Sequence, residues 1–155
     1  MSVRGTSYSE RTMKADPFEL DRFVNAQAGT HEMALAEIRA GRKRTHWMCF
    51  VFPQLTGLGH SPMAQRYGVT GLDEAEAYLT HPTLGPRLRE VTSALADLPH
   101  PDAEKVFGLV DAIKLSSALT LFATADKDGA LFQRMLARWF GAPDPATLRL
   151  LGLSL

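Results

Sequence analysis

Apolar residues recur at helical spacing along much of the chain, and one segment shows the pattern most clearly. After His81-Pro82, five apolar residues are spaced four, three, four and three positions apart: Leu84, Leu88, Val91, Leu95 and Leu98. This spacing places their side chains on one face of a helix. The pattern therefore predicts an amphipathic helix that buries this face.

Start and stop signals predict several more helices. An Asp or Ser followed by Pro is typical of a helix start, because the side chain caps free backbone N–H groups and Pro suits the first helical position. This pair occurs at Asp16-Pro17, Ser61-Pro62 and Asp144-Pro145. Further expected caps are Thr30, Asp102, and Thr70 with Asp73 in a pattern that resembles a capping box. Glycines at positions 29, 41, 68, 108 and 141 mark expected helix ends.

Two continuous apolar segments need a separate interpretation. Residues 112–123 are apolar or small on nearly every face, which predicts a buried central helix. Residues 47–52 are apolar throughout, and periodicity alone does not separate strand from helix there. Because no second strand candidate is present to pair with them, we interpret these residues as helical. The predicted fold is all-α, a single compact domain at 16–155 of about seven to nine short helices after a disordered tail at 1–15.

Composition and charge narrow the class of protein. Of 155 residues, 17 are Lys or Arg and 17 are Asp or Glu, so the formal net charge is zero. A neutral protein offers little attraction to nucleic acid or to an anionic membrane, and no stretch reaches the roughly eighteen apolar residues of a membrane helix. Cys49 is the single cysteine, which excludes an intramolecular disulfide and favours a reducing compartment. We expect a cytoplasmic protein, with the oligomeric state left open.

The loop before Ser61-Pro62 is a candidate anion site. Gly57 and Gly59 allow the backbone to approach a ligand closely, and the helix expected after Ser61 presents free N–H groups to an anion. Arg42 and Arg44 belong to the one tight basic cluster of the chain, a few residues upstream. The pattern predicts binding of a phosphate or carboxylate. The alternative is a turn in which the glycines serve backbone geometry and Ser61 only caps the helix.

The expected helix over residues 43–52 suggests one wall of such a site. It would place Arg42 and His46 one turn apart and align Trp47 with Gln54. Trp47 would stack on a flat ligand such as a nucleobase, Gln54 would offer an amide, and His46 would act as a general acid or base. The alternative is that Trp47 belongs to the core and that His46 is a structural histidine.

Lys114 and Ser117 form a second candidate pair, because a lysine can activate a serine hydroxyl as a nucleophile. With His46 they are the candidate catalytic residues. The alternative is that Asp111 caps this helix and pairs locally with Lys114. The five histidines are scattered without the spacing of metal ligands, so we expect neither a metal nor a cofactor.

Several strings of the sequence resemble a bacterial family of uncharacterised domains. They are His46-Trp47-Met48, Phe52-Pro53-Gln54, Gly57-Leu58-Gly59, His81-Pro82-x-Leu84-Gly85 and Thr120-Leu121-Phe122. Many members carry the name calpastatin, and the family is typified by a mycobacterial hypothetical protein. The resemblance runs from about Asp16 to Leu151 and implies a mainly helical fold, but no activity, substrate or catalytic residue. Calpastatin denotes a disordered protease inhibitor, and the apolar composition of this chain argues against that function.

The chain departs from the family pattern at two places. Cys49 stands where a tryptophan is usual, and Ser116-Ser117-Ala118-Leu119 replaces a charged residue followed by Ser-Ser-Met. Ser117 keeps the first of these serines, whereas Ala118 replaces the second. A mechanism that needed the second hydroxyl would not operate here.

Two functional hypotheses follow from these patterns. The first is a domain that binds a phosphorylated or nucleotide-like small molecule, for example an ADP-ribose derivative, and hydrolyses or transfers it. The alternative is a non-enzymatic interaction module whose basic turn, Arg42 to Arg44, meets an acidic protein partner. In the second case His46 and Gln54 would be replaceable without loss of the partner.

Overall fold

A computed structural model of the chain describes residues 15–153. This part contains ten helices and no strand, which confirms the all-α prediction with one helix more than the upper end of the expected range. The helices are α2 (Asp21–Gln27), α3 (His31–Arg39), α4 (Met48–Val51), α5 (Pro62–Arg66), α6 (Leu72–Thr80), α7 (Leu84–Ala96), α8 (Ala103–Phe107), α9 (Leu109–Ala125), α10 (Leu131–Phe140) and α11 (Pro145–Leu150). The expected disordered tail lies outside the described residues apart from Ala15. No helix within 15–153 is long and apolar enough to cross a membrane.

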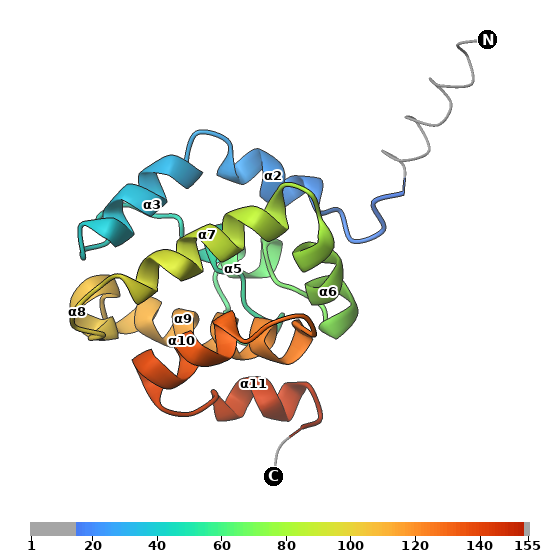
Figure 1. Cartoon of the computed structure of the whole chain (residues 1–155). Helices are drawn as coiled ribbons and strands as arrows, with labels where there is room; N and C mark the ends of the chain where they lie inside the picture. The colour runs from blue at the N-terminus through green and yellow to red at the C-terminus, as the bar shows by residue number, and fades with distance from the viewer. Residues whose placement is uncertain (1–14, 154–155) are drawn as a thin grey trace.

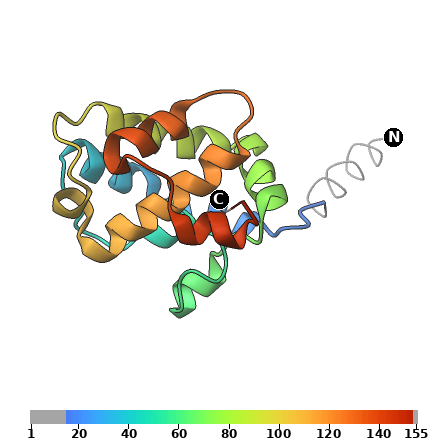
Figure 2. The same cartoon turned by 90° about the horizontal axis from the view of Figure 1, so that it is seen from below.

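Helix α9 is the centre of the fold. It packs against α4, α6, α8, α10 and α11, and Figure 2 shows α11 crossing it on the side that faces the viewer. Side chains are buried on most faces of α9 from Leu115 onward, among them Leu119 and Phe122. The prediction of a buried central helix is confirmed for this part. The first turn is different, because Leu109 and Ile113 are exposed.

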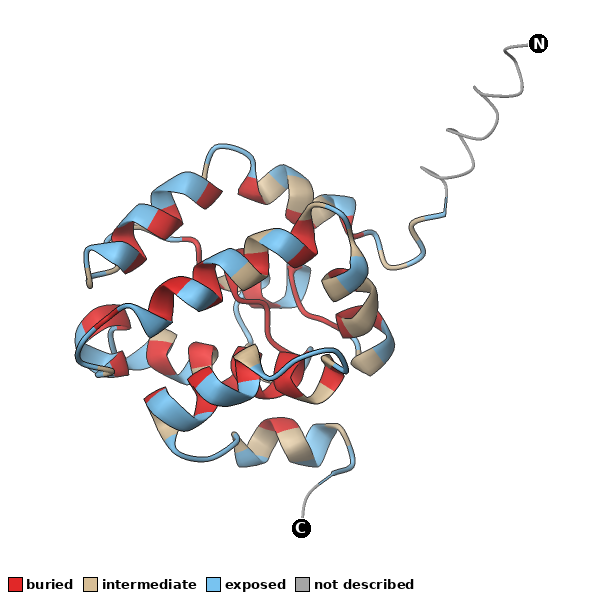
Figure 3. Cartoon of the chain, viewed as in Figure 1, coloured by how far each residue is buried: buried red, intermediate tan, exposed pale blue. Residues whose placement is uncertain are grey.

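Helix α7 crosses the middle of the molecule between the layer of α2 and α3 and the layer of α9 and α10 (Figure 1). The five residues of its predicted apolar stripe are all buried. Red bands of buried residues alternate with tan and pale blue ones along α7 in Figure 3, and α3, α6 and α10 pack against this helix. The ring Nδ1 of His81 accepts hydrogen bonds from the backbone N–H groups of Thr83 and Leu84, so this histidine caps the helix.

Two predicted helix starts differ from the structure. The helix predicted to begin after Asp16 begins at Asp21, because Glu19 adopts a left-handed φ of 55°. The carboxylate of Asp16 still acts as a cap, since it accepts hydrogen bonds from the backbone N–H groups of Leu20 and Asp21. At α6 the capping carboxylate belongs to Glu74 and not to Asp73: it accepts from the N–H and the hydroxyl of Thr70. Glu74 is buried, and Arg22 neutralises it at 3.0 Å.

The predicted helix over residues 43–52 is shortened to the four residues of α4. Residues before it follow an irregular path, and residues after it are extended as far as an isolated parallel bridge between Leu55 and Val69. Gln27 of α2 ties α4 to the body, since its amide donates to the carbonyl of Phe50 and to the hydroxyl of Tyr78. The following loop and α5 then stand away from the body, as the green segment of Figure 2 shows.

Candidate functional site: a cationic cavity beside α9

A cavity of about 280 Å³ lies between the 43–50 segment, the start of α5 and the first turns of α9. Its lining residues are Lys43, His46, Trp47, Met48, Cys49, Phe50, Ser61, Met63, Asp111 and Lys114. Segments far apart in the sequence therefore meet here, and they bring two lysines, a histidine, an aspartate and the single cysteine to one place. Within residues 15–153, no three His, Cys, Asp or Glu side chains gather as a metal site would require.

The two lysines have different surroundings. Lys43 is fixed: its Nζ lies 2.9 Å from a carboxylate oxygen of Asp111 and 4.9 Å from the ring centre of Trp47, and only 7% of its side chain is exposed. Lys114 has no carboxylate partner among the described residues, and its Nζ donates to the Sγ of Cys49 at 3.6 Å. With Asp111 balanced by Lys43, the cavity carries one uncompensated positive charge, at Lys114.

Glu37 of α3 fixes the wall of the cavity, although it does not line it. Its buried carboxylate accepts four hydrogen bonds, from the N–H of Arg44, the N–H and hydroxyl of Thr45, and the Nε1–H of Trp47, at 2.6–3.1 Å. Burial alone would raise the pKa of Glu37, but these hydrogen bonds outweigh it and lower the pKa from 4.5 to about 2. Glu37 is therefore ionised at neutral pH and holds residues 44–47 in place.

Sequence reasoning missed Glu37, although a signal was present. The residue lies between Ala34 and Ile38 on the apolar face of α3. A carboxylate on the apolar face of an amphipathic helix must find donors, because an unpaired buried charge is costly. Such a residue is a candidate anchor for a neighbouring segment.

Four of the predicted site residues line the cavity: His46, Trp47, Ser61 and Lys114. His46 is exposed at its edge. Trp47 is only 1% exposed, and its ring packs against Phe52 and Phe107. It is thus part of the core, and the ammonium of Lys43 lies over its ring.

Six predicted site residues lie outside the cavity: Arg42, Arg44, Gln54, Gly57, Gly59 and Ser117. Arg42 and Arg44 are exposed on the surface, whereas Gln54 is buried. The Ser117 hydroxyl donates to the carbonyl of Ile113 and to the carboxylate of Asp144. The Ser117 hydroxyl therefore does not contact Lys114. Asp111 forms its ion pair with Lys43 and not with Lys114, the local partner that the alternative had predicted.

The two loop glycines have structural reasons for being glycine. Gly57 adopts a φ of +102°, which side chains rarely allow. A Cβ on Gly59 would lie 2.5 Å from the Cβ of Ala64 and 3.0 Å from the amide oxygen of Gln54. Ser61 accepts from the N–H of Ala64 and caps α5. The alternative interpretation, a turn with a capping serine, accounts for Gly57, Gly59 and Ser61. Ser61 also lines the cavity.

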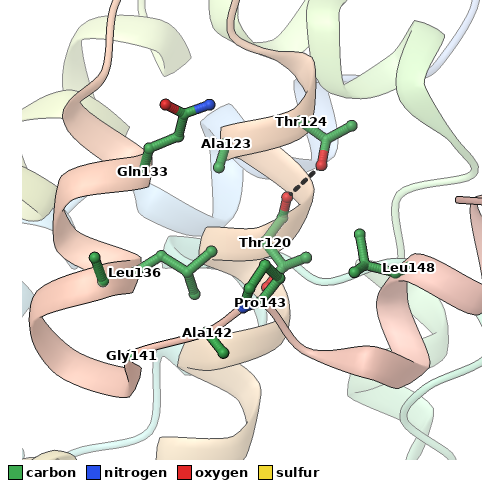
Figure 4. Close-up of a pocket in the computed structure, with 10 residues that line it drawn as sticks. Thr120, Ala123, Thr124, Gln133, Leu136, Gly141, Ala142, Pro143 and Leu148 are labelled. Carbon is green, nitrogen blue, oxygen red and sulfur yellow. Dashed lines mark hydrogen bonds between the residues drawn. The ribbon is translucent and has the colours of Figure 1, made fainter. Parts of the chain in front are cut away.

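A second cavity, of about 300 Å³, lies between α9, α10 and α11, and none of the residues in 15–153 that line it is ionisable (Figure 4). Its hydroxyl groups are already paired within the fold. Thr124 donates to the carbonyl of Thr120, and the Thr120 hydroxyl donates to the carbonyl of Ser116 and accepts from the N–H of Asp144. This cavity is a crevice between helices with little chemistry to offer a ligand.

Comparison with known proteins agrees with this architecture. Residues 17–151 match the model of a family described as "Protein of unknown function (DUF1810)". The chain belongs to this family. It is also similar to the crystal structure of the conserved hypothetical protein Rv1873 from Mycobacterium tuberculosis, with 49% identity and a TM-score of 0.86 over 90% of this chain and all of that one. No curated protein matches.

The family confirms the resemblance seen in the sequence as far as it concerns an uncharacterised helical family. The name calpastatin finds no support, since neither the family description nor the similar structure carries it. Membership in DUF1810 assigns no ligand and no reaction to the cationic cavity.

Proposed function

We propose that the cationic cavity binds a small molecule through a phosphate or carboxylate group. The observation that carries this proposal is the ammonium of Lys114, which lines the cavity and has no carboxylate partner among the described residues. A half-buried ammonium interacts with an anion more strongly than an exposed one, because less solvent screens the pair. Lys43 also lines the cavity, but Asp111 balances its charge at 2.9 Å, so Lys114 provides the net positive charge.

The size of the cavity limits the ligand. A volume of about 280 Å³ is at the lower end of the range for small-molecule sites. A phosphate with an attached sugar suits this space. The base of a nucleotide would have to lie outside, toward the exposed side chain of Met63, because the Trp47 ring is covered. A sugar phosphate, or the phosphate end of a nucleotide or ADP-ribose derivative, is the ligand class we propose.

Hydrolysis or transfer of the bound phosphoryl compound is the enzymatic part of the proposal. The imidazole of His46 lines the same cavity and is exposed at its edge. Histidine is the side chain best suited to exchange a proton near neutral pH, so His46 is the proposed general acid or base. Replacing His46 by Ala should leave binding of inorganic phosphate within a few-fold and abolish any turnover.

The alternative, an interaction module based on the basic turn, has less support. Only Arg42 and Arg44 face the solvent, because Lys43 is buried against Asp111 and Trp47. Two exposed arginines form a small electrostatic footprint on a neutral protein.

Replacing Lys114 by Met should remove most of the binding of phosphorylated ligands. A charge-assisted hydrogen bond is worth about 1.5–3 kcal/mol, so the dissociation constant should rise about 10- to 100-fold. The measurement is a thermal-shift series with inorganic phosphate, ribose 5-phosphate, AMP and ADP-ribose, since a ligand that binds only the folded state raises the melting temperature. Lys105→Met is the matched control, because Lys105 is exposed and does not line the cavity. If no compound of the series raises the melting temperature, the proposal fails.

A further inference from the structure

A groove of about 600 Å³ lies on the opposite face of α9 from the cationic cavity. It is formed by the first turns of α9, the end of α10, the start of α8 and the residue that caps α11. Its lining residues are Pro101, Asp102, Ala103, Glu104, Leu109, Ala112, Ile113, Ser116, Trp139, Phe140 and Asp144. Nothing in the proposed small-molecule site uses these side chains.

The floor of the groove is apolar and open. Leu109 and Ile113 lie one helical turn apart on α9 and are 62% and 58% exposed. Val110, at 65%, extends the apolar surface beside them. Single exposed aliphatic residues are ordinary, but a cluster of them rimmed by polar residues is typical of an interaction surface.

Trp139 contributes a second, independent feature. Its side chain is only 6% exposed and lines the groove, yet its Nε1–H has no hydrogen-bond acceptor among the described residues. A buried donor left unpaired lowers stability. The ring of Trp139 belongs to the wall of the groove, so a bound segment would change its surroundings.

The rim of the groove is acidic. Asp102, Glu104 and Asp144 line it, and no lysine or arginine in the part of the chain that the structure describes does. None of these three carboxylates forms an ion pair with a residue in 15–153. Asp102 and Asp144 cap the N-termini of α8 and α11, whereas Glu104 has no such role. The groove therefore combines an apolar floor with an acidic rim that no lysine or arginine of residues 15–153 neutralises.

We propose that this groove docks a cationic, amphipathic segment of a partner protein. Aliphatic side chains of the partner cover Leu109 and Ile113, and its lysines or arginines meet the acidic rim. Charge complementarity decides between partners. A second copy of this chain in a two-fold symmetric contact would bring one acidic rim against another, which is repulsive.

The test uses the full chain, labelled with nitrogen-15, and a short peptide with leucine and lysine at helical spacing. We expect saturable binding that weakens as salt is added, with a shift of the Trp139 indole N–H signal. The indole N–H of Trp47 should not move, because it is bonded to Glu37. Ile113→Ser should bind the peptide about tenfold more weakly or worse, the change expected from losing burial of one aliphatic side chain. Glu104→Lys should also weaken binding of the lysine peptide relative to the native chain, and the effect should be largest at low salt.

Two controls keep this proposal separate from the small-molecule site. Lys114→Met should bind the peptide as the native chain does. A peptide of the same pattern with glutamate in place of lysine should not bind. The proposal is overturned if both peptides bind equally, if neither binds, or if Ile113→Ser binds the lysine peptide unchanged. It is also overturned if sedimentation shows that a second copy of the chain occupies the groove in a dimer that Ile113→Ser disrupts.

Discussion

Replacing Glu37 by Ala is expected to lower the free energy of unfolding by about 3–5 kcal/mol, because it leaves one buried donor and three part-buried donors without an acceptor. The Nε1–H of Trp47 is the most deeply buried of these, and the Arg44 and Thr45 N–H groups lose their partner with it. Such a loss is a large share of the total for a domain of this size. Urea unfolding followed by circular dichroism measures it. Glu32→Ala on the same helix is the matched control: Glu32 is exposed, and the change should stay within about 0.5 kcal/mol.

The same carboxylate should make stability depend on pH in a defined window. The folded pKa of Glu37 is about 2 against an ordinary value of 4.5, so its contribution is fully present above pH 4.5 and is lost as the pH falls toward 2. The amount is on the order of 3 kcal/mol. In Glu37→Gln this part of the acid dependence should disappear. Asp126 contributes in the same direction, because hydrogen bonds from Arg89 outweigh its burial and lower its pKa, and that contribution should remain in the variant.

Gly85→Ala should lower the free energy of unfolding by about 2–4 kcal/mol through overpacking. A Cβ at Gly85 would lie 2.2 Å from the carbonyl oxygen of Leu79, so the start of α7 would have to move away from α6. The gain of about 1 kcal/mol that alanine has over glycine in a helix is too small to offset this. Thermal or urea unfolding provides the measurement.

Gly71→Ala provides the comparison for Gly85. A Cβ there meets nothing within 4 Å, and the φ of 170° is extended backbone that alanine adopts. Because Gly71 is the N-cap of α6, where alanine is less favourable than glycine, the variant should lose less than about 1 kcal/mol. Equal stability of the two variants would show that the contact between α6 and α7 is looser than the structure indicates. Gly85 belongs to the string His81-Pro82-x-Leu84-Gly85 of the family resemblance, and this contact gives a physical reason for a glycine there.

The helical fold was largely predictable from the sequence. The apolar stripe of α7, the buried α9 and the caps Ser61, Asp102 and Asp144 all depend on residues close together in the chain. The errors arose where distant contacts decide the local structure. Residues 43–47 are not helical, because Glu37 accepts hydrogen bonds from backbone and side-chain donors of this segment. Gln27 also donates to the carbonyl of Phe50 in the short helix that follows.

The candidate site was predictable only in part. His46 and Lys114 are 68 residues apart, and the chance that they share a cavity cannot be read from spacing along the chain. Local geometry misled the interpretation of Trp47 and Gln54, because an apolar helix wall and a core segment have the same composition. Lys43, Cys49 and Asp111 reach the cavity through tertiary packing, which the local sequence pattern does not show.

The rate at which iodoacetamide alkylates Cys49 is the most direct measure of whether the cationic cavity holds an anion. Cys49 is the single cysteine of the chain, and its Sγ lies 3.6 Å from the Nζ of Lys114. We expect ribose 5-phosphate to slow alkylation in a saturable manner at constant ionic strength, and to have little effect on the rate in Lys114→Met. Protection that is equal in the two proteins would contradict the account, as would a rate that inorganic phosphate, ribose 5-phosphate, AMP and ADP-ribose all leave unchanged.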